Sequence, residues 1–470
     1  MLIALHVLIQ TGLILRVLLH PNREPSVRLT WVVVILVLPV FGILTYLLLG
    51  EARMRPRRLA RHRAAIARLP PRAILPEASE ADDLPAILFR VGQSISGFAP
   101  VAGNSACLMA NAEDTVARMV ADIDAAQDHV HLMCYIWLPD DSGTRLAQAL
   151  IRAAGRGVTC RALADDFGAR AMIGDPLWAQ MRAAGVRLAR SLPIGNPLLQ
   201  AVFGRIDMRN HRKILVIDNH ITYCGSQNCA DAAFLPKAKY APWVDAVLRF
   251  SGPIARQNQR VFAADWMAEV PQDDLTALLS APMPPDHAGF PAQVVAMGPM
   301  DRPSAVPELF AALIYAARRE VIITTPYFVP VDALQSALRA AANRGVAVTL
   351  ILPARNDDFA VAAASRSYYA DLICAGVQIY EYGAGLLHAK TVTVDGVVSL
   401  IGSANMDCRS FALNFENNIL LSDVEVTAAL RARQMSYLAD STLITAEAVA
   451  AWPLHRQLWN NAMAILGPIL

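Results

Sequence analysis

Hydrophobic positions divide the chain into an apolar start and a long remainder of short, alternating patterns. Residues 2–19 are almost entirely apolar, and residues 29–49 form a second apolar run that carries no charge. Each run has close to the ~20 residues that a helix needs to cross the hydrocarbon core of a bilayer. The pattern therefore predicts a transmembrane helical hairpin over residues 1–50.

A basic segment follows the second apolar run. Seven arginines stand between residues 53 and 68, and a polar stretch with several prolines continues to residue 84. Because arginine-rich flanks stay on the cytoplasmic side of a membrane, we predict a multi-pass protein of the cell (inner) membrane with cytoplasmic domains. A cleaved signal peptide is the alternative, but neither a basic start nor a small-residue cleavage site precedes the second run. We interpret residues 51–84 as a basic juxtamembrane segment and linker.

Strand and helix patterns then alternate, and the series repeats. Strand patterns at 129–137 and 159–166 flank a helical pattern at 145–158, and the same order returns between residues 320 and 358. The segment AAGRGV of the first copy corresponds to AAANRGV of the second. This alternation favours an α/β fold built from two duplicated α/β sandwich domains.

A proline-dense connector separates the two copies. It covers residues 271–291, so we place the domain boundary near residue 290. The first domain is then expected over residues 85–290 and the second over residues 291–470.

Composition agrees with a membrane anchor and a reducing compartment. Hydrophobic residues make up 55% of the chain and the mean hydropathy is +0.35, which is high for a soluble protein. The net charge of +2 does not indicate a polyanionic partner. Seven scattered cysteines do not form a disulfide framework, and we interpret them all as small buried residues.

The candidate chemistry lies in a motif that occurs twice. Residues 211–228 read HRKILVIDNHITYCGSQN, and residues 388–405 read HAKTVTVDGVVSLIGSAN. Both copies contain H-x-K, four residues, Asp, six residues and G-S-x-N. Identical spacing in two copies is not an accident of composition. The repeated positions are His211, Lys213, Asp218, Gly225, Ser226 and Asn228, and then His388, Lys390, Asp395, Gly402, Ser403 and Asn405.

The spacing places complementary groups on one surface. On a strand, residues two apart share a face, so the His and Lys of each H-x-K are expected to project together. The two lysines and the asparagines Asn228 and Asn405, supported by Ser226 and Ser403, would hold a tetrahedral anion such as a phosphoryl group. A histidine can act as nucleophile or as acid and base. A metal site is the alternative, but a cationic lysine beside each histidine would oppose a divalent ion, so no metal is expected.

Acidic residues near the motifs complete the candidate site. Aligning the strands that follow each motif places Asp245 opposite Glu416. Each carboxylate is expected to hydrogen-bond a histidine ring nitrogen and fix its tautomer, the alternative being a surface acid at a strand edge. Asp218 and Asp395 belong to the catalytic motif, although their position at a strand end favours a structural role.

The duplicated motif resembles that of the phospholipase D superfamily, in which two such halves form one active site. The resemblance covers most of the chain beyond residue 80. Flanking stretches such as PYF-x-P (326–330) and ARNDD (354–358) are most similar to the bacterial cardiolipin synthases. In the superfamily an acidic residue after G-S-x-N holds the catalytic histidine. Glu416 has the close spacing, whereas Asp245 follows an insertion.

The resemblance implies a phosphatidyltransferase acting on phospholipids in the membrane, without a cofactor and without nucleic acid. His211 would attack the phosphorus of phosphatidylglycerol while His388 protonates the departing glycerol, giving a phosphatidyl-histidine intermediate; the two histidines could also be exchanged. A second phosphatidylglycerol would then accept the group and yield cardiolipin. The alternatives are a phospholipase D that uses water, and synthases that use serine or phosphatidylethanolamine. A superfamily nuclease gains nothing from two apolar spans, and a scaffold without activity would not retain all twelve motif positions.

Overall fold

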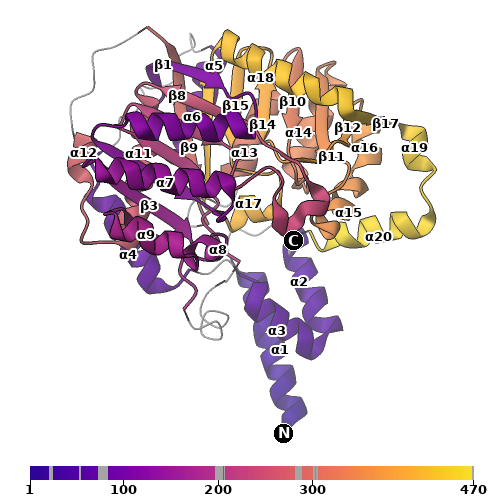
Figure 1. Ribbon diagram of the computed structural model, residues 1–470. Coiled ribbons are helices and arrows are strands. Elements are labelled where there is room, and N and C mark those ends of the chain that lie inside the picture. Colours follow the sequence, from indigo (N-terminus) through magenta and orange to yellow (C-terminus); the bar gives the residue numbers. More distant parts are fainter. Residues whose placement is uncertain are drawn as a thin grey trace.

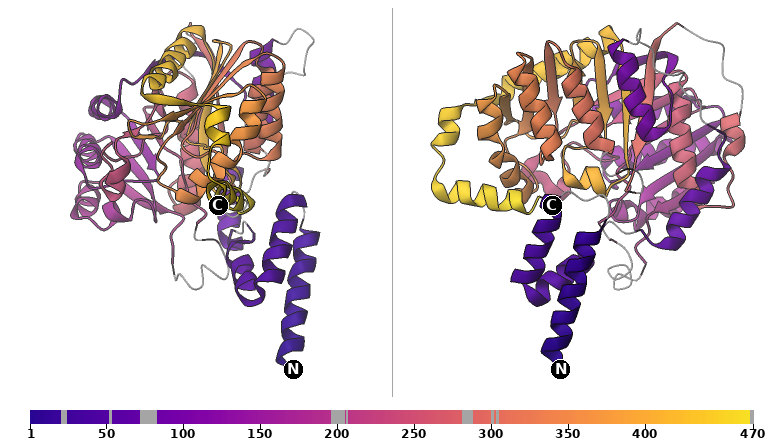
Figure 2. Two further views of the ribbon diagram at one scale, coloured as in Figure 1. Left: turned by 90° about the vertical axis from the view of Figure 1, so that its right-hand side faces the viewer. Right: turned by 180° about the vertical axis from the view of Figure 1, so that it is seen from behind.

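The computed structural model describes residues 1–20, 25–51, 54–71, 83–195, 205, 207–280, 288–299, 302 and 305–467. Three apolar helices project from one side of a larger α/β body (Figures 1 and 2). These helices are α1 (Leu2–Leu19), α2 (Pro25–Val37) and α3 (Pro39–Leu49). Among the described residues, α1 alone is long and apolar enough to cross a membrane.

The expectation of one spanning helix over residues 29–49 is wrong, because the run breaks at Pro39. A proline inside a helix lacks the N–H for the ladder and clashes with the preceding turn. Helix α3 folds back on α2, so that the rings of Trp31 and Tyr46 lie 5.2 Å apart. A Cβ on Gly42 would lie 2.2 Å from the Val34 carbonyl oxygen, so this close approach requires glycine.

Polar contacts fasten α1 to this α2–α3 hairpin. Arg16 donates two hydrogen bonds to the carboxylate of Glu51, at 2.7 and 3.0 Å, and the Tyr46 hydroxyl donates a third at 2.7 Å. Deeper along α1, the Gln10 amide donates to the Ile35 carbonyl at 2.9 Å. The base of the hairpin therefore lies beside the end of α1, and its tip lies beside the middle of α1.

The body is built on one sheet to which both halves contribute. Among the described residues, fifteen strands pair in the order β17-β12-β11-β10-β14-β15-β16-β9-β1-β8-β6-β5-β2-β3-β4. The first half supplies β1 (Val101–Leu108), β2 (His129–Cys134), β3 (Thr159–Asp165), β4 (Arg187–Ser191), β5 (Ile214–Ile217), β6 (Ile221–Gly225) and β8 (Val247–Ser251). The second half supplies β9 (Phe290–Met297), β10 (Glu320–Thr324), β11 (Ala347–Pro353), β12 (Gln378–Tyr382), β14 (Thr391–Val394), β15 (Val398–Gly402), β16 (Glu416–Ser422) and β17 (Ser441–Ile444). A separate short ladder joins β7 (Trp243–Val244) and β13 (Leu386–Leu387).

The duplication predicted from the patterns is confirmed in the strand order. In the first half, β2 pairs in parallel with β3 and antiparallel with β5. In the second half, β10 pairs in the same way with β11 and β14. The crossover helices are α7 (Asp141–Gly155) and α14 (Asp332–Asn343), each of which packs an apolar face on its sheet.

Helices cover both faces of the sheet (Figure 1). In the first half they are α5 (Leu84–Ser96), α6 (Ala112–Ala125), α8 (Arg170–Ile173), α9 (Pro176–Ala183), η1 (Leu235–Tyr240), α11 (Ile254–Glu269) and α12 (Thr276–Ser280). In the second half they are α13 (Ala305–Ala316), α15 (Phe359–Ser367), α16 (Tyr369–Cys374), α17 (Cys408–Ala412), α18 (Val424–Tyr437), η2 (Leu438–Asp440), α19 (Ala446–Ala450) and α20 (Leu454–Ile465). The basic helix α4 (Pro56–Arg68) packs against α11.

The two halves share a central core. Its buried residues come from strands of both halves and include Val216 and Ile401, together with Phe262 of α11 and Leu430 of α18. Helix α5 belongs to the first half in sequence, yet its Leu88 joins the core of the second half. Because the core is shared, the division of the chain at residue 290 stays a prediction. The shared core fixes the position of one half against the other, which is what brings the two motifs together.

Candidate active site

Each H-x-K segment stands directly before the first strand of a β-hairpin. His211 to Lys213 lead into the β5–β6 hairpin, and His388 to Lys390 lead into the β14–β15 hairpin. Positive φ angles at Asp218 (51°) and Asp395 (53°) close the two turns. The β-branched residues of both strands are buried, which fixes the register and the direction in which the motif side chains project.

The backbones of the two motifs are paired across the halves. The His211 amide donates to the Phe415 carbonyl at 3.0 Å, and the His388 amide donates to the Val244 carbonyl at 2.8 Å. Each histidine is therefore held beside the strand that follows the G-S-x-N of the other half. This exchange gives the site an approximate two-fold symmetry.

The carboxylates follow the same crossed arrangement. His211 donates through Nδ1 to Glu416 Oε2 at 3.0 Å, and His388 donates through Nδ1 to Asp245 Oδ1 at 2.6 Å. A hydrogen bond to a carboxylate places the ring proton on Nδ1, so the Nε2 lone pair of each imidazole is left for chemistry. Each half thus supplies the carboxylate that orients the histidine of the other half.

The motif serines contact these carboxylates. The Ser226 hydroxyl donates to Asp245 Oδ1 at 2.6 Å, and the Ser403 hydroxyl donates to Glu416 Oε2. The serines therefore support the orienting carboxylates, whereas the sequence had placed them in support of the phosphate. Glu416 is fully buried and also accepts hydrogen bonds from Ser410 and Asn414, at 3.0 and 3.1 Å.

The two lysines lie buried within the site. Lys213 Nζ donates to the carbonyl of His211, and Lys390 Nζ donates to the carbonyl of His388, each at 2.7 Å. Burial lowers the pKa of Lys213 to about 8 and that of Lys390 to about 7. The charge of Lys213 also lowers the pKa of both Lys390 and His388. The charged groups of one motif therefore affect those of the other.

The pKa values of the two histidines leave both of them neutral at neutral pH. Burial lowers the pKa of His211 to about 4, opposed by Glu416 and assisted by Lys213. Burial also lowers the pKa of His388 to about 4, with Lys390 acting in the same direction and Asp245 against it. Burial alone would raise the pKa of Asp245, but His388 and Lys390 lower it to about 2. The orienting carboxylate is therefore ionised beside a neutral imidazole.

The two motif asparagines lie beside this cluster in different settings. The side-chain oxygen of Asn228 accepts a hydrogen bond from the Ile136 backbone amide at 3.2 Å. The side-chain oxygen of Asn405 is buried without a hydrogen-bond partner in the described part of the chain. An unpaired buried amide is costly, so Asn405 is suited to a ligand that completes its hydrogen bonding.

Asp218 and Asp395 lie outside the site, which corrects their inclusion among the catalytic residues. Asp218 accepts the backbone N–H groups of Gln127, Asp128 and His129, each at 2.9 Å. Asp395 accepts the N–H groups of residues 318–320 in the same way. Each aspartate stands at the far end of its strand, roughly 20 Å from its motif histidine at ~3.3 Å per residue. Their role is to fasten the hairpin turn to the neighbouring strand.

Two aromatic rings lie beside the histidines and were not identified as site residues from the sequence. The Tyr135 ring meets His211 edge-on at 5.0 Å, and the Trp243 ring lies 4.6 Å from His388. Trp243 stands two residues before Asp245, so its place beside the orienting carboxylate was the available signal. Tyr135 follows the buried strand β2, but nothing in its spacing indicates a site residue.

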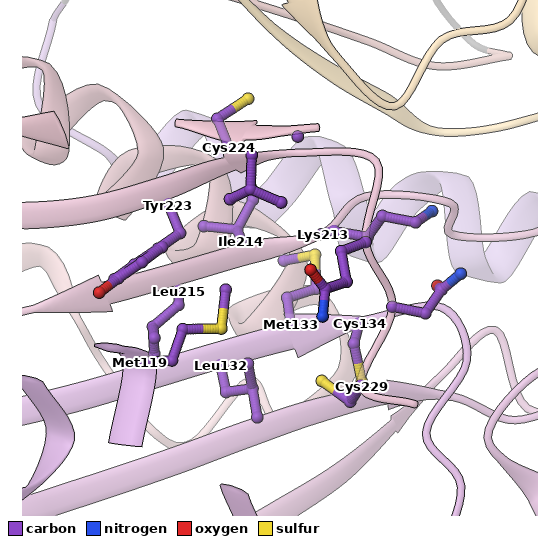
Figure 3. Close-up of a pocket in the computed structure, with 14 residues that line it drawn as sticks. Met119, Leu132, Met133, Cys134, Lys213, Ile214, Leu215, Tyr223, Cys224 and Cys229 are labelled. Carbon is purple, nitrogen blue, oxygen red and sulfur yellow. The ribbon is translucent and has the colours of Figure 1, made fainter. Parts of the chain in front are cut away.

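A small cavity lies behind Lys213, between β2, β5 and β6 (Figure 3). Its walls are mainly apolar, and Cys134 and Cys229 lie next to each other at its edge. Burial raises the pKa of the Cys134 thiol well above its usual value, so this cysteine acts as a small apolar residue. Cys107 and Cys374 are exposed, which corrects the expectation that all cysteines are buried.

No group of three or more His, Cys, Asp or Glu side chains that could hold a metal ion occurs in the described ranges. The described residues of the site supply two imidazoles, two lysine amino groups and two orienting carboxylates.

Comparison with known proteins agrees with this geometry. The family described as cardiolipin synthase, PLD-like domain, matches residues 119–266 and 310–436, which contain both motifs and both orienting carboxylates. The chain belongs to this family. A second family, described as phospholipase D-nuclease N-terminal, matches residues 8–51, which include α2 and α3.

Relatives within the cardiolipin synthase family match nearly the whole chain. Cardiolipin synthase A of Salmonella paratyphi B and that of Salmonella newport are each 35% identical over 477 residues, covering 98% of this chain and 96% of the relative. Among solved structures, phosphatidylserine synthase of Haemophilus influenzae Rd KW20 has a TM-score of 0.59 at 14% identity. That match covers 82% of this chain and all of the other, and it shows that the two share a fold.

Proposed function

We propose that the protein is a cardiolipin synthase, a phosphatidyltransferase that joins two phosphatidylglycerol molecules into cardiolipin and releases glycerol. The observation that carries this proposal is the crossed pair of carboxylate-held histidines beside two buried lysines. Two histidines with free Nε2 atoms can divide nucleophilic attack and proton transfer between them. Family membership over nearly the full length supplies the substrate class.

In the first step, His211 Nε2 attacks the phosphorus of a phosphatidylglycerol. The P–N bond forms as the P–O bond to the head-group glycerol breaks. His388 enters this step as the imidazolium, protonated on both ring nitrogens in the substrate complex, and gives its Nε2 proton to the departing oxygen. Lys213 and Lys390 hold the non-bridging oxygens, whose negative charge they neutralise. The product is a phosphatidyl group on His211 and a neutral His388.

Geometry favours this division of roles. The hydrogen bond from His388 to Asp245 measures 2.6 Å, shorter than the 3.0 Å bond from His211 to Glu416. Short, charge-assisted bonds favour the imidazolium form, so His388 is the better proton carrier. A bound phosphodiester also adds a negative charge that raises the pKa of His388 above the value of about 4 that burial gives it.

In the second step, His388 accepts the proton of a hydroxyl group on a second phosphatidylglycerol. The hydroxyl oxygen attacks the phosphorus, the P–N bond breaks, and His211 returns to its neutral form. One phosphodiester is exchanged for another, so the atoms balance without a cofactor or an energy-rich donor. The rings of Tyr135 and Trp243 limit the access of water to the two imidazoles.

We further propose that the protein sits in the cell membrane with its body in the cytoplasm. Helix α1 crosses the bilayer, and the arginines of α4 lie at the cytoplasmic surface. Helices α2 and α3 have 13 and 11 residues. At ~1.5 Å per residue, neither spans a hydrocarbon core of about 30 Å. The α2–α3 hairpin therefore enters the bilayer from the cytoplasmic side and returns to that side. It takes the place of the second membrane crossing that a multi-pass protein would have.

Product analysis tests the function. The purified full-length protein would be given phosphatidylglycerol labelled in both its acyl chains and its head group, and the products would be separated with and without the His211→Ala substitution. Cardiolipin together with free glycerol, both lost in the variant, is the expected result. Phosphatidic acid as the sole product would identify a hydrolase that uses water. Turnover only after addition of serine or phosphatidylethanolamine would show that the added compound, and not a second phosphatidylglycerol, is the other substrate.

A further inference from the structure

A groove outside the active site lies between η1, α15 and α20. Three cations line it, Lys239, Arg355 and Arg456, and none of them pairs with a carboxylate in the part of the chain that the structure describes. The Lys239 ammonium lies 4.7 Å from the Tyr240 ring, and the Arg456 guanidinium lies 4.2 Å from the Trp452 ring. Aromatic faces thus hold two of the three cations in place.

The acidic groups nearby are already engaged. Asp357 accepts hydrogen bonds from Lys237 and from the Tyr327 hydroxyl. Asp358 caps α15 by accepting two backbone N–H groups. Arg366, the fourth cation of the lining, pairs with Glu381 at 2.9 Å. The groove therefore presents a net positive surface.

An unpaired polar group also lines this groove. Asn460 is 4% exposed, and its side-chain amide nitrogen has no hydrogen-bond acceptor among the described residues. A buried N–H₂ without a partner costs free energy that an oxygen-rich ligand would recover. A cationic groove with an unpaired amide donor is suited to a phosphate group.

Helix α20 has one face that packs on the protein and another face that is apolar and exposed. Met463 and Ala464 pack beside α15, whereas Leu454, Leu458 and Ile465 are 71, 61 and 66% exposed. At 100° per residue, these three residues fall within about 40° of one another around the helix. A helix with one exposed apolar face and cations nearby is typical of the bilayer interface.

An exposed aromatic pair lies between α20 and α15 and lines the groove. The rings of Phe359 and Trp459 stack with centroids 6.4 Å apart, and the two residues are 73 and 48% exposed. Figures 1 and 2 show α20 along the side of the body from which α1–α3 project, and lying crosswise to α1. When α1 crosses the bilayer, α20 then lies along its surface.

We propose that the groove between η1, α15 and α20 binds the phosphate of an anionic phospholipid headgroup while α20 lies in the bilayer interface. The cations and Asn460 hold the phosphate, and the apolar face of α20 enters the acyl boundary. This contact docks the second half on the membrane independently of α1–α3. It does not depend on which reaction the active site performs.

The experiment uses the full-length protein in nanodiscs. Hydrogen exchange of peptides from α15 and α20 would be compared in phosphatidylcholine discs with and without phosphatidic acid, a lipid that carries a phosphate but no alcohol to be displaced. Slower exchange of both helices with phosphatidic acid is expected. The Arg355→Gln/Arg456→Gln double variant should lose this difference, and Arg339→Gln, which changes an arginine of α14, should keep it.

Each remaining outcome has a stated meaning. Equal exchange in the two kinds of disc, or an unchanged difference in the double variant, would overturn the proposal. The same slowing produced by inorganic phosphate in phosphatidylcholine discs would assign the groove to a free anion and would also overturn it. Replacing Leu454 and Leu458 by Gln should weaken the slowing although the cations remain.

Kinetics provide a second readout that a purely structural role would not produce. With lipid in nanodiscs, we expect the KM to rise about fivefold for each arginine removed, since a cation near an anionic surface contributes about that factor. The kcat should not change, and neither constant should change for a short-chain lipid dispersed as monomers. A fall in kcat on the monomeric lipid would indicate damage to the fold.

Discussion

Substituting Glu416 by Gln tests the crossed arrangement of the active site. The carboxylate accepts hydrogen bonds from His211 and from three neighbouring side chains, and it is fully buried. A carboxamide keeps the shape but loses the charge, and its N–H₂ group replaces one of the two oxygens that lie 3.0 and 3.1 Å from His211 Nδ1. The hydrogen bond that remains is weaker and no longer fixes the tautomer of His211, and the other tautomer has no lone pair on Nε2.

The size of the effect follows from these contacts. A hydrogen bond to a charged group is worth about 1.5–3 kcal/mol, and a wrong histidine tautomer can reduce kcat by as much as about 10,000-fold. We therefore expect a loss of about 100- to 10,000-fold in kcat/KM, which corresponds to roughly 3 to 5 kcal/mol. The protein should remain folded because the volume is conserved, and the thermal unfolding midpoint checks this.

The assay uses a phosphatidyl ester whose leaving group is p-nitrophenol. This group departs without protonation, so the reaction no longer needs the acid His388. Asp245→Asn, which affects His388, should recover most of its first-turnover rate with this lipid. Glu416→Gln should not recover, because it affects the nucleophile His211. Recovery of the Glu416 variant but not of the Asp245 variant would refute the assigned roles, and equal behaviour of both would refute the crossed pairing.

Three further predictions concern other parts of the chain. Burial lowers the pKa of Lys390 to about 7, so its charge is present below that pH and is lost above it; kcat/KM should fall above pH 7, and Lys390→Arg should move this fall to higher pH, whereas an unchanged profile would exclude Lys390 as its source. Asp218→Ala removes three hydrogen bonds from a turn far from the chemistry, so the free energy of unfolding should drop by roughly 1–3 kcal/mol with kcat/KM unchanged, and a large loss of activity would contradict this. Cysteines replacing Trp31 and Tyr46 should cross-link with a short bifunctional reagent, since the rings lie 5.2 Å apart, whereas a straight helix would separate these positions by about 22 Å and prevent the cross-link.

Local patterns predicted the duplicated fold and the motif geometry. The β-branched residues after each H-x-K form buried strands, and the alternation of strand and helix recurs in both halves, because these features depend on neighbouring residues. The turn role favoured for Asp218 and Asp395 also followed from their position at a strand end. Comparing the two copies gave the positions of Asp245 and Glu416.

Contacts between distant segments could not be predicted in this way. The exchange of carboxylates between the halves depends on how the two halves of the sheet join. The sequence of either copy alone does not indicate it. Ser226 and Ser403 were assigned to the phosphate because their carboxylate partners come from the next strand. The break at Pro39 was visible in the sequence, but the apolar length of residues 29–49 was given more weight.

The measurement that tests the account most directly is the location of the covalent intermediate. The His388→Ala variant would be mixed with the p-nitrophenyl lipid, and its peptides analysed by mass spectrometry. The first step then proceeds without an acid, while the second step is slow because no base activates the acceptor hydroxyl. A phosphatidyl group on His211 is the predicted result. An adduct on any other residue, or release of p-nitrophenol without an adduct while the second step is blocked, would contradict the mechanism.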